Sequence, residues 1–185
     1  MKNEDIKKAL NPIVNANSRI LILGSLPSDK SIIQNEYYGN KNNQFWDIIS
    51  MVFENEKIKF KDYNEKIKFL NKHCIALWDV YSVAERNGSL DTNIKNGKFN
   101  NIKEFLNEHK EIKKVLTNGK KAEKGFREYL KKENKYCDYR NVTSSSSANT
   151  RYTIIEKVEI WKEAILGWKI KKILIFQLMW LYKLT

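Results

Sequence analysis

The chain has 185 residues, of which 42% are hydrophobic and 12% aromatic, enough apolar material for one domain with one substantial core. This composition excludes general disorder, and two cysteines, Cys74 and Cys137, are too few for a disulfide framework or a four-thiolate metal cluster. Thirty-four Lys and Arg against 22 Asp and Glu give a net charge of +12, which favours nucleic acid as a partner, then an acidic membrane surface. A Lys-rich surface without functional meaning is the alternative.

Neither end of the sequence predicts export or membrane insertion. The first residues, MKNEDIKKALNPIV, lack the apolar core of a signal peptide, so we expect a cytoplasmic, nucleoid-associated protein. The C-terminal ILIFQLMWLYKLT is strongly apolar, but about a dozen residues fall short of the roughly 20 that span a bilayer. We expect residues 1–168 to form a single domain and the apolar extension 169–185 to pack on or beside it, with a membrane-surface segment as the alternative.

The first half of the chain predicts two buried strands with a loop and a helix between them. SRILILGS (18–25) is a continuous apolar run stopped by Gly and Pro, as is typical of a buried parallel strand. The loop YYGNKNNQFW (37–46) is rich in aromatic and amide side chains. The helix that follows has one apolar face, formed by Phe45, Ile48, Ile49, Val52 and Phe53. CIALWDVY (74–81) predicts the second strand.

The second half continues the alternation of helices and strands. NIKEFLNEH (101–109) predicts a short helix capped by Asn101 with Glu104 at the third position, and IKKVLTNG (112–119) a third strand. A helix follows, with an apolar face of Ala122, Phe126, Tyr129 and Leu130. YRNVT (139–143) predicts a weaker fourth strand. The last helix begins at a Thr153–Glu156 capping box and buries Ile154, Val158, Trp161, Ile165 and Trp168.

This order of elements predicts an α/β fold around a short, mainly parallel four-stranded sheet. The segments GSLPS, WDV, TNG and VTSSSSANTRY each follow the end of a predicted strand. In open α/β sheets the ligand crevice lies at the carboxyl ends of the strands, so we expect these four loops to converge on one site.

The loops contain the side chains that suit a planar heterocycle. There is no phosphate-binding G-x-x-x-x-G-K-[ST] or G-x-G-x-x-G motif, His73 and His109 lack metal-ligand spacing, and no His follows a strand to activate Ser25. We therefore expect no metal and no cofactor. Amides, hydroxyls, aromatics and one acid, Asp79, can stack on a nucleobase, bind its edge and hold a phosphate.

The segments RILILGSLPS…YYGNKNNQFW, IALWDV…RNGSLD, LTNGKKA and VTSSSSAN resemble, in order and spacing, the motifs of the uracil-DNA glycosylase superfamily. The likeness covers residues 18–168 and points to the hypoxanthine-DNA (deoxyinosine) glycosylase branch, near the mismatch-specific uracil/thymine glycosylases. It implies a three-layer α/β/α sandwich and a monofunctional glycosylase that hydrolyses the N-glycosidic bond of a flipped, deaminated base. The implied partner is double-stranded DNA containing a damaged base, without an obligatory protein partner. A uracil- or mismatch-specific enzyme and a catalytically weakened nucleic-acid-binding module are the alternatives.

The same resemblance assigns roles to individual residues of the expected site. Asn43, from the NQFW element, is implied as the catalytic amide that orients a water, with capping of the following helix as its other role. Tyr38 is implied to stack on the flipped base, or else is an ordinary core aromatic. Asp79 is implied to bind the edge of the base, with a turn or N-cap as the alternative. Gly24 and Ser25 belong to the same base-binding group.

Further residues are implied to hold DNA. They are Pro27, Ser28, Ser144, Ser145, Ser146, Ser147, Asn149 and Arg151. Asn149 and Arg151 are the candidates for filling the vacated stack or probing the minor groove. The sequence departs from the family pattern at Leu26, where an acid or amide is common, and at Thr143 and Ser147, where prolines are usual. We expect these changes to weaken uracil excision and to leave the loop at residues 144–149, called the serine loop below, less rigid.

Overall fold

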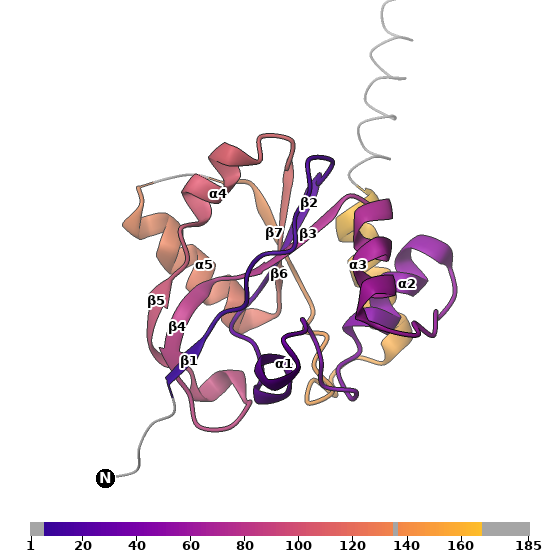
Figure 1. Ribbon diagram of the computed structural model, residues 1–185, viewed down its shortest axis with the longest axis horizontal. Helices are drawn as coiled ribbons and strands as arrows, with labels where there is room; N and C mark the ends of the chain where they lie inside the picture. Colours follow the sequence, from indigo (N-terminus) through magenta and orange to yellow (C-terminus); the bar gives the residue numbers. More distant parts are fainter. Residues whose placement is uncertain (1–5, 135–136, 168–185) are drawn as a thin grey trace, which may run out of the picture.

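The four predicted strands form a parallel sheet, which is the middle of three layers in the computed structural model (Figure 1). The structure describes residues 6–134 and 137–167. In spatial order the strands are β3 (Ile75–Asp79), β2 (Ile20–Gly24), β6 (Lys114–Asn118) and β7 (Tyr139–Val142). The predicted α/β/α arrangement around a four-stranded parallel sheet is confirmed.

Strand β2 is apolar throughout because both faces of the sheet are covered. Leu21 and Leu23 point into one hydrophobic cluster, whereas Ile20 and Ile22 point into the other, on the opposite face. Every residue of this strand is buried. A continuous apolar run, rather than an alternating one, is what a central parallel strand requires.

Helices from both halves of the chain cover the two faces. One face is covered by α2 (Phe45–Glu54), α3 (Tyr63–Lys72) and a helix that is described over residues 154–167. The other face is covered by α4 (Ile102–Glu108) and α5 (Lys120–Lys132). Figure 1 shows the two groups on opposite sides of the strands.

The predicted helix starts are confirmed by their hydrogen bonds. The side chain of Asn101 accepts from the backbone N–H of Glu104 at the start of α4. Thr153 Oγ1 accepts from Glu156 N–H at 3.3 Å, and the Glu156 carboxylate accepts from Thr153 N–H at 2.7 Å. Such reciprocal bonds satisfy N–H groups that have no partner within the helix. Trp168 and the apolar extension 169–185 lie outside the described residues.

The predicted strand 74–81 is wrong in its last part, because the chain leaves the parallel sheet after Asp79. Strand β4 (Tyr81–Glu85) pairs instead with two short strands, β1 (Ile6–Lys8) and β5 (Lys95–Phe99), in an antiparallel sheet. The Val80 N–H still donates to Gly24 O at 2.9 Å, so the crossing stays attached to the end of β2.

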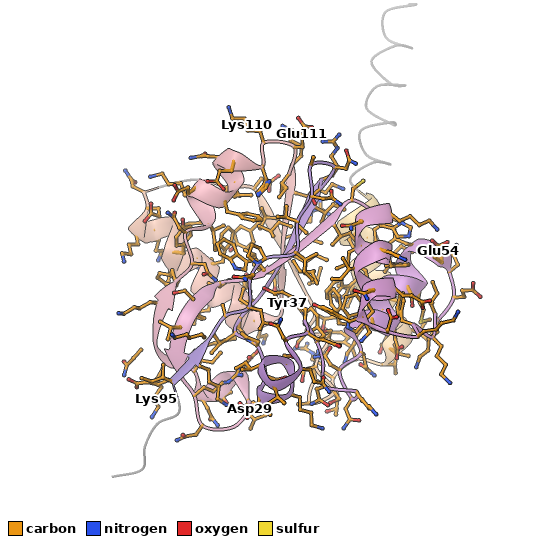
Figure 2. The ribbon with its side chains drawn as sticks, in the orientation of Figure 1. Asp29, Tyr37, Glu54, Lys95, Lys110 and Glu111 are labelled. Atoms are coloured by element: carbon orange, nitrogen blue, oxygen red, sulfur yellow. The ribbon has the colours of Figure 1, made fainter. Side chains whose placement is uncertain are left out.

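Three further short or polar elements were not predicted. They are α1 (Asp29–Gln34), α3 and the 3₁₀ turn η1 (Asp91–Asn93). Figure 2 shows charged side chains such as Lys95, Lys110 and Glu111 at the periphery, whereas Tyr37 lies in the interior, 4% exposed. Over residues 6–134 and 137–167, no helix combines the length and the apolar character needed to cross a membrane.

Candidate active site

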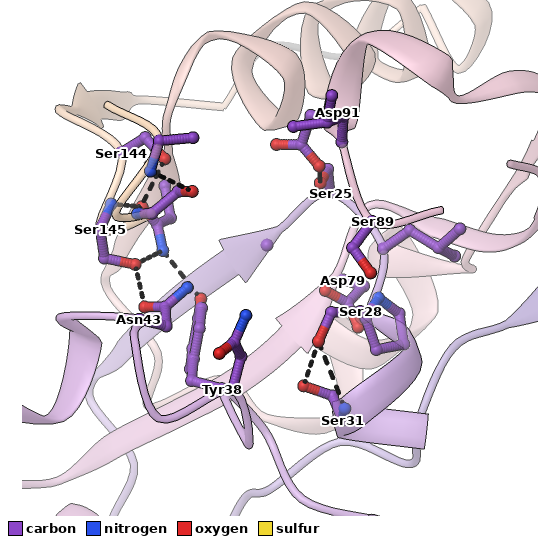
Figure 3. Close-up of a pocket in the computed structure, with 18 of the residues that line it drawn as sticks. Ser25, Ser28, Ser31, Tyr38, Asn43, Asp79, Ser89, Asp91, Ser144 and Ser145 are labelled. Carbon is purple, nitrogen blue, oxygen red and sulfur yellow. Dashed lines mark hydrogen bonds between the residues drawn. The ribbon is translucent and has the colours of Figure 1, made fainter. Parts of the chain in front are cut away.

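The strand-end loops meet in one cavity of about 330 Å³ at the carboxyl end of the parallel sheet (Figure 3). This volume lies near the lower end of the roughly 300–1,000 Å³ that is typical of small-molecule sites. Of the residues expected to bind substrate, only Ser147 and Arg151 lie outside the lining, and both are exposed. Those that line the cavity are Gly24, Ser25, Pro27, Ser28, Tyr38, Asn43, Asp79, Ser144, Ser145, Ser146 and Asn149.

The amide of Asn43 has a fixed orientation, with its nitrogen left for the cavity. Its Oδ1 accepts from the Phe45 N–H at 3.0 Å and from the Ser145 hydroxyl at 3.0 Å. A backbone N–H can only donate, so the oxygen, not the nitrogen, must face Phe45. Helix α2 starts at Phe45, and Asn43 binds its first N–H from outside the helix. Asn43 therefore holds the helix start and still presents an N–H donor to the cavity.

Asn118, at the end of β6, connects the two sides of the cavity. Its Nδ2 donates to Tyr38 Oη at 3.0 Å and to Ser145 Oγ at 2.9 Å, while its Oδ1 accepts from the Ser145 N–H at 2.9 Å. Ser145 in turn donates to Asn43 (Figure 3). One continuous hydrogen-bond network thus sets the positions of both Tyr38 and Asn43. The sequence placed Asn118 near the site but gave no sign of this central position.

Tyr38 is held in an unusual backbone conformation that directs its ring into the cavity lining. Its φ is +54°, a left-handed value that is costly for a large side chain. The ring stacks on Phe45 at a centroid distance of 3.8 Å, and the neighbouring Tyr37 is fixed by the hydroxyl of Tyr63. Burial holds the pKa of the Tyr38 phenol well above its usual value, so the ring is neutral.

Asp79, the last residue of β3, is a buried acid at the floor of the cavity. It is 4% exposed, and its Oδ2 has no hydrogen-bond partner among the described residues. Burial raises the pKa of Asp79 to about 7; repulsion by Asp91 adds to the rise, and the charge of Arg86 opposes it. Near neutral pH this carboxyl is therefore present in both protonation states.

Two charged residues of the cavity, Arg86 and Asp91, were not singled out from the sequence. The carboxylate of Asp91 accepts from the Ser25 hydroxyl at 2.6 Å. The buried guanidinium of Arg86 donates to the carbonyl oxygens of Leu26 and Pro27. Together, Arg86 and Asp91 hold the loop after β2 in position. The signal available beforehand was the charged and turn-forming segment RNGSLD, which follows a strand.

This geometry has close counterparts among known proteins. A family model described as the uracil DNA glycosylase superfamily matches residues 12–165. The chain belongs to this superfamily. The resemblance found in the four sequence motifs is thereby confirmed.

Curated relatives and a solved structure support the same placement in the superfamily. A protein of Methanosarcina barkeri named hypoxanthine DNA glycosylase is 34% identical over 158 residues, which are 85% of this chain and 97% of that protein. A protein of the same name from Methanosarcina acetivorans is 35% identical, covering 80% of this chain and 91% of its own length. The solution NMR structure of a candidate uracil DNA glycosylase from M. acetivorans superposes with a TM-score of 0.71 at 31% identity, covering 86% of this chain and 99% of that one.

The departures from the superfamily pattern have structural counterparts. Leu26 is 5% exposed and packs in the hydrophobic cluster of Leu21 and Leu23, so it offers no polar group. In the serine loop, Asn149 donates to Thr143 Oγ1 at 2.8 Å and to Ser144 O at 3.0 Å. These two bonds restrain the loop without prolines, and they engage both N–H groups of Asn149.

Ser28 also has a local role in this superfamily member. Its hydroxyl accepts from the Ser31 N–H at 3.3 Å and so caps α1, the short helix beside the cavity (Figure 3).

Over the described part of the chain, no group of three or more His, Cys, Asp or Glu side chains could hold a metal ion.

Gly24 is the position at which the smallest change should disturb the site. A methyl group on its Cα would collide with Asp79 Oδ1 and lie 3.6 Å from Tyr38 Oη. Gly24→Ala is therefore expected to displace the carboxyl, lowering the rate on a damaged duplex by about tenfold or more while costing about 1–3 kcal/mol of stability. Single-turnover kinetics and urea unfolding of the same preparation measure both effects. Unchanged rates would show that the position of Asp79 does not matter for the reaction.

Proposed function

We propose that this protein is a monofunctional DNA glycosylase that removes hypoxanthine from deoxyinosine in double-stranded DNA. The observation that carries the proposal is that Tyr38, Asn43 and Asp79 line a single cavity of about 330 Å³. An aromatic ring, an amide donor and a carboxyl acceptor are the groups needed to receive one extruded base and act on its sugar. The names of the two Methanosarcina relatives support hypoxanthine as the base.

In this proposal Asp79 and Tyr38 hold the base. Hypoxanthine carries one N–H on its six-membered ring, N1–H, and the unpartnered Oδ2 of Asp79 is a buried acceptor for such a donor. Uracil offers a similar N3–H, which keeps the uracil- or mismatch-specific enzyme open as the alternative. Tyr38 supplies aromatic surface for stacking in the cavity lining.

Asn43 aligns the water that attacks the sugar. Its amide N–H donates to one lone pair of the water oxygen, leaving the other lone pair free to attack C1′. The C1′–N bond breaks with its electron pair passing to the base, the water oxygen bonds to C1′, and the proton lost by the water is taken up by the departing base. The transition state has oxocarbenium character, as in other glycosidic cleavages.

The product is an abasic site in an intact strand. No lysine is among the described residues that line the cavity, so no amine is positioned to form a Schiff base with C1′. The net charge of +12 supports salt-sensitive binding to the duplex, and the hydroxyls of Ser144, Ser146 and Ser147 are donors for its phosphates. With DNA as its substrate, the enzyme would act in the cytoplasm, at the nucleoid.

Labelled duplexes carrying one inosine, uracil or xanthine test the proposal. Incubation is followed by alkali, which cleaves abasic sites, and an undamaged duplex is the control. We expect strand breaks at inosine only after alkali, with uracil cleaved more slowly.

Three outcomes would contradict the proposal in different ways. No cleavage of any duplex at stoichiometric enzyme would favour the binding module, in keeping with the altered residues Leu26, Thr143 and Ser147. Faster release of uracil would favour the uracil-specific alternative. Strand breaks before alkali would indicate a lyase and exclude a water nucleophile.

A further inference from the structure

Lys157 is a buried cation that the reaction described above does not use. It lies in the first turn of the helix over residues 154–167 and is 1% exposed. No carboxylate of the described residues lies within 4 Å of its Nζ, and burial alone lowers the pKa of Lys157, with no contribution from another charge. Its position is also unfavourable, because the N-terminal end of a helix repels positive charge. An anion supplied by a ligand would offset the cost of burying this charge.

The contacts of Lys157 show where that anion would lie. Its ammonium donates to Gln44 Oε1 at 2.7 Å and to Ser146 O at 3.3 Å. The Gln44 N–H donates to Ser145 O at 2.9 Å. Lys157 thus connects the serine loop with the segment that contains Asn43. Neither Lys157 nor Gln44 lines the cavity. Both contacts are neutral acceptors, so they do not neutralise the charge of Lys157.

In the serine loop, three backbone N–H groups are already engaged within the protein. The N–H groups of Ser145, Ser146 and Ala148 are already donated to Asn118, Ser144 and Ser146 respectively. The remaining hydroxyls are weak neutral donors, which bind phosphate well only where positive charge supports them.

We propose that Lys157 is the buried counter-charge for one backbone phosphate of the DNA, bound on Ser144–Ser147 next to the extruded nucleotide. This inference rests on the proposed function. Lys157 is then a positioning residue: phosphate binding on the loop is coupled, through Gln44 and Ser145, to the segment that holds the Asn43 amide. The coupling makes the enzyme most active when the phosphate beside the damaged base is in place.

A cycle that removes each charge in turn tests the coupling. Lys157→Met keeps the length of the side chain and removes its charge. Lys162→Met is the matched control, since Lys162 lies on the same helix, is partly exposed and donates to Asn55 at 3.1 Å, away from the cavity. On the DNA side, a neutral methylphosphonate replaces, one at a time, each phosphate flanking deoxyinosine. Both kcat/KM and Kd are measured for all pairs.

At one of these positions, we expect the methylphosphonate to lower kcat/KM and to raise Kd of the wild-type protein by about tenfold or more. In Lys157→Met the same replacement should change these quantities by less than about twofold. Lys162→Met should keep the wild-type pattern. Equal losses in wild type and Lys157→Met at every position would overturn the proposal and leave Lys157 as a structural tie. Circular dichroism checks folding, and Lys157→Gln, which keeps a donor for Ser146 O, replaces the Met variant if that variant is unfolded. If the wild type cleaves no damaged duplex, the proposed glycosylase fails, yet the cycle in Kd still decides the phosphate site.

Discussion

Asn43→Ala is expected to lower the single-turnover rate on an inosine duplex by about 10²–10³-fold while leaving Kd for that duplex within about threefold. The reason is that the amide N–H is the one group of Asn43 that faces the cavity, since its oxygen is occupied by Phe45 and Ser145. Loss of the oxygen frees one N–H at the start of α2, so we expect only about 1 kcal/mol of destabilisation. Rapid-quench kinetics, anisotropy titration and thermal unfolding measure the three quantities.

Asn43→Asp separates donation from acceptance. An aspartate keeps an acceptor for Phe45 and Ser145 but has no N–H for the cavity, so we expect it to be as slow as the alanine variant. A rate for Asn43→Asp above the wild-type rate would mean that this position works as a base. Wild-type activity of Asn43→Ala would remove Asn43 from the reaction altogether.

The parallel sheet could be predicted because β2 and β3 are continuous apolar runs, and the more polar β6 and β7 continue the alternation of helices and strands. The position of the loops at the strand ends then placed Asp79 and the serines together, and the resemblance to the superfamily added Tyr38 and Asn43. All of these except Ser147 line one cavity. The antiparallel sheet could not be predicted in the same way. Its strands are short and partly polar, and β1 meets β4 across more than 70 residues of intervening chain, a pairing without a local signal.

Individual side-chain roles depended on contacts that the sequence does not contain. Arg86 and Asp91 act on the loop after β2 only because the chain changes sheets at Val80 and brings the next turn back beneath it. Lys157 follows Ile154 by three residues on an otherwise apolar face, yet its burial results from the serine loop lying over it. The second hydrogen bond to the Asn43 amide oxygen comes from Ser145, more than 100 residues away.

The second large effect is expected at Asp79, where removal of a charge should stabilise the fold and impair the enzyme. The groups that act on this carboxyl are Arg86, Asp91, Tyr37 and Tyr38. Its pKa of about 7 in the folded state lies above the ordinary value of 3.8, so the folded protein binds a proton that the unfolded chain has released. Stability therefore falls as pH rises from about 4 to 7, and the full penalty is present above pH 7.

Asp79→Asn lacks this penalty, so at pH 8 it should be more stable than the wild type by on the order of 2–4 kcal/mol, with the difference shrinking towards pH 4. Its rate on inosine should drop by tenfold or more, because the neutral amide binds N1–H less strongly than a carboxylate does, by about 1–2 kcal/mol. The wild-type rate should rise with pH through about 7, whereas the variant should show no such rise. Urea unfolding and single-turnover rates at pH 5–8 measure these quantities. A wild-type rate that instead falls through pH 7 would show that the protonated acid donates to the base, which reverses the role of Asp79 from acceptor to donor.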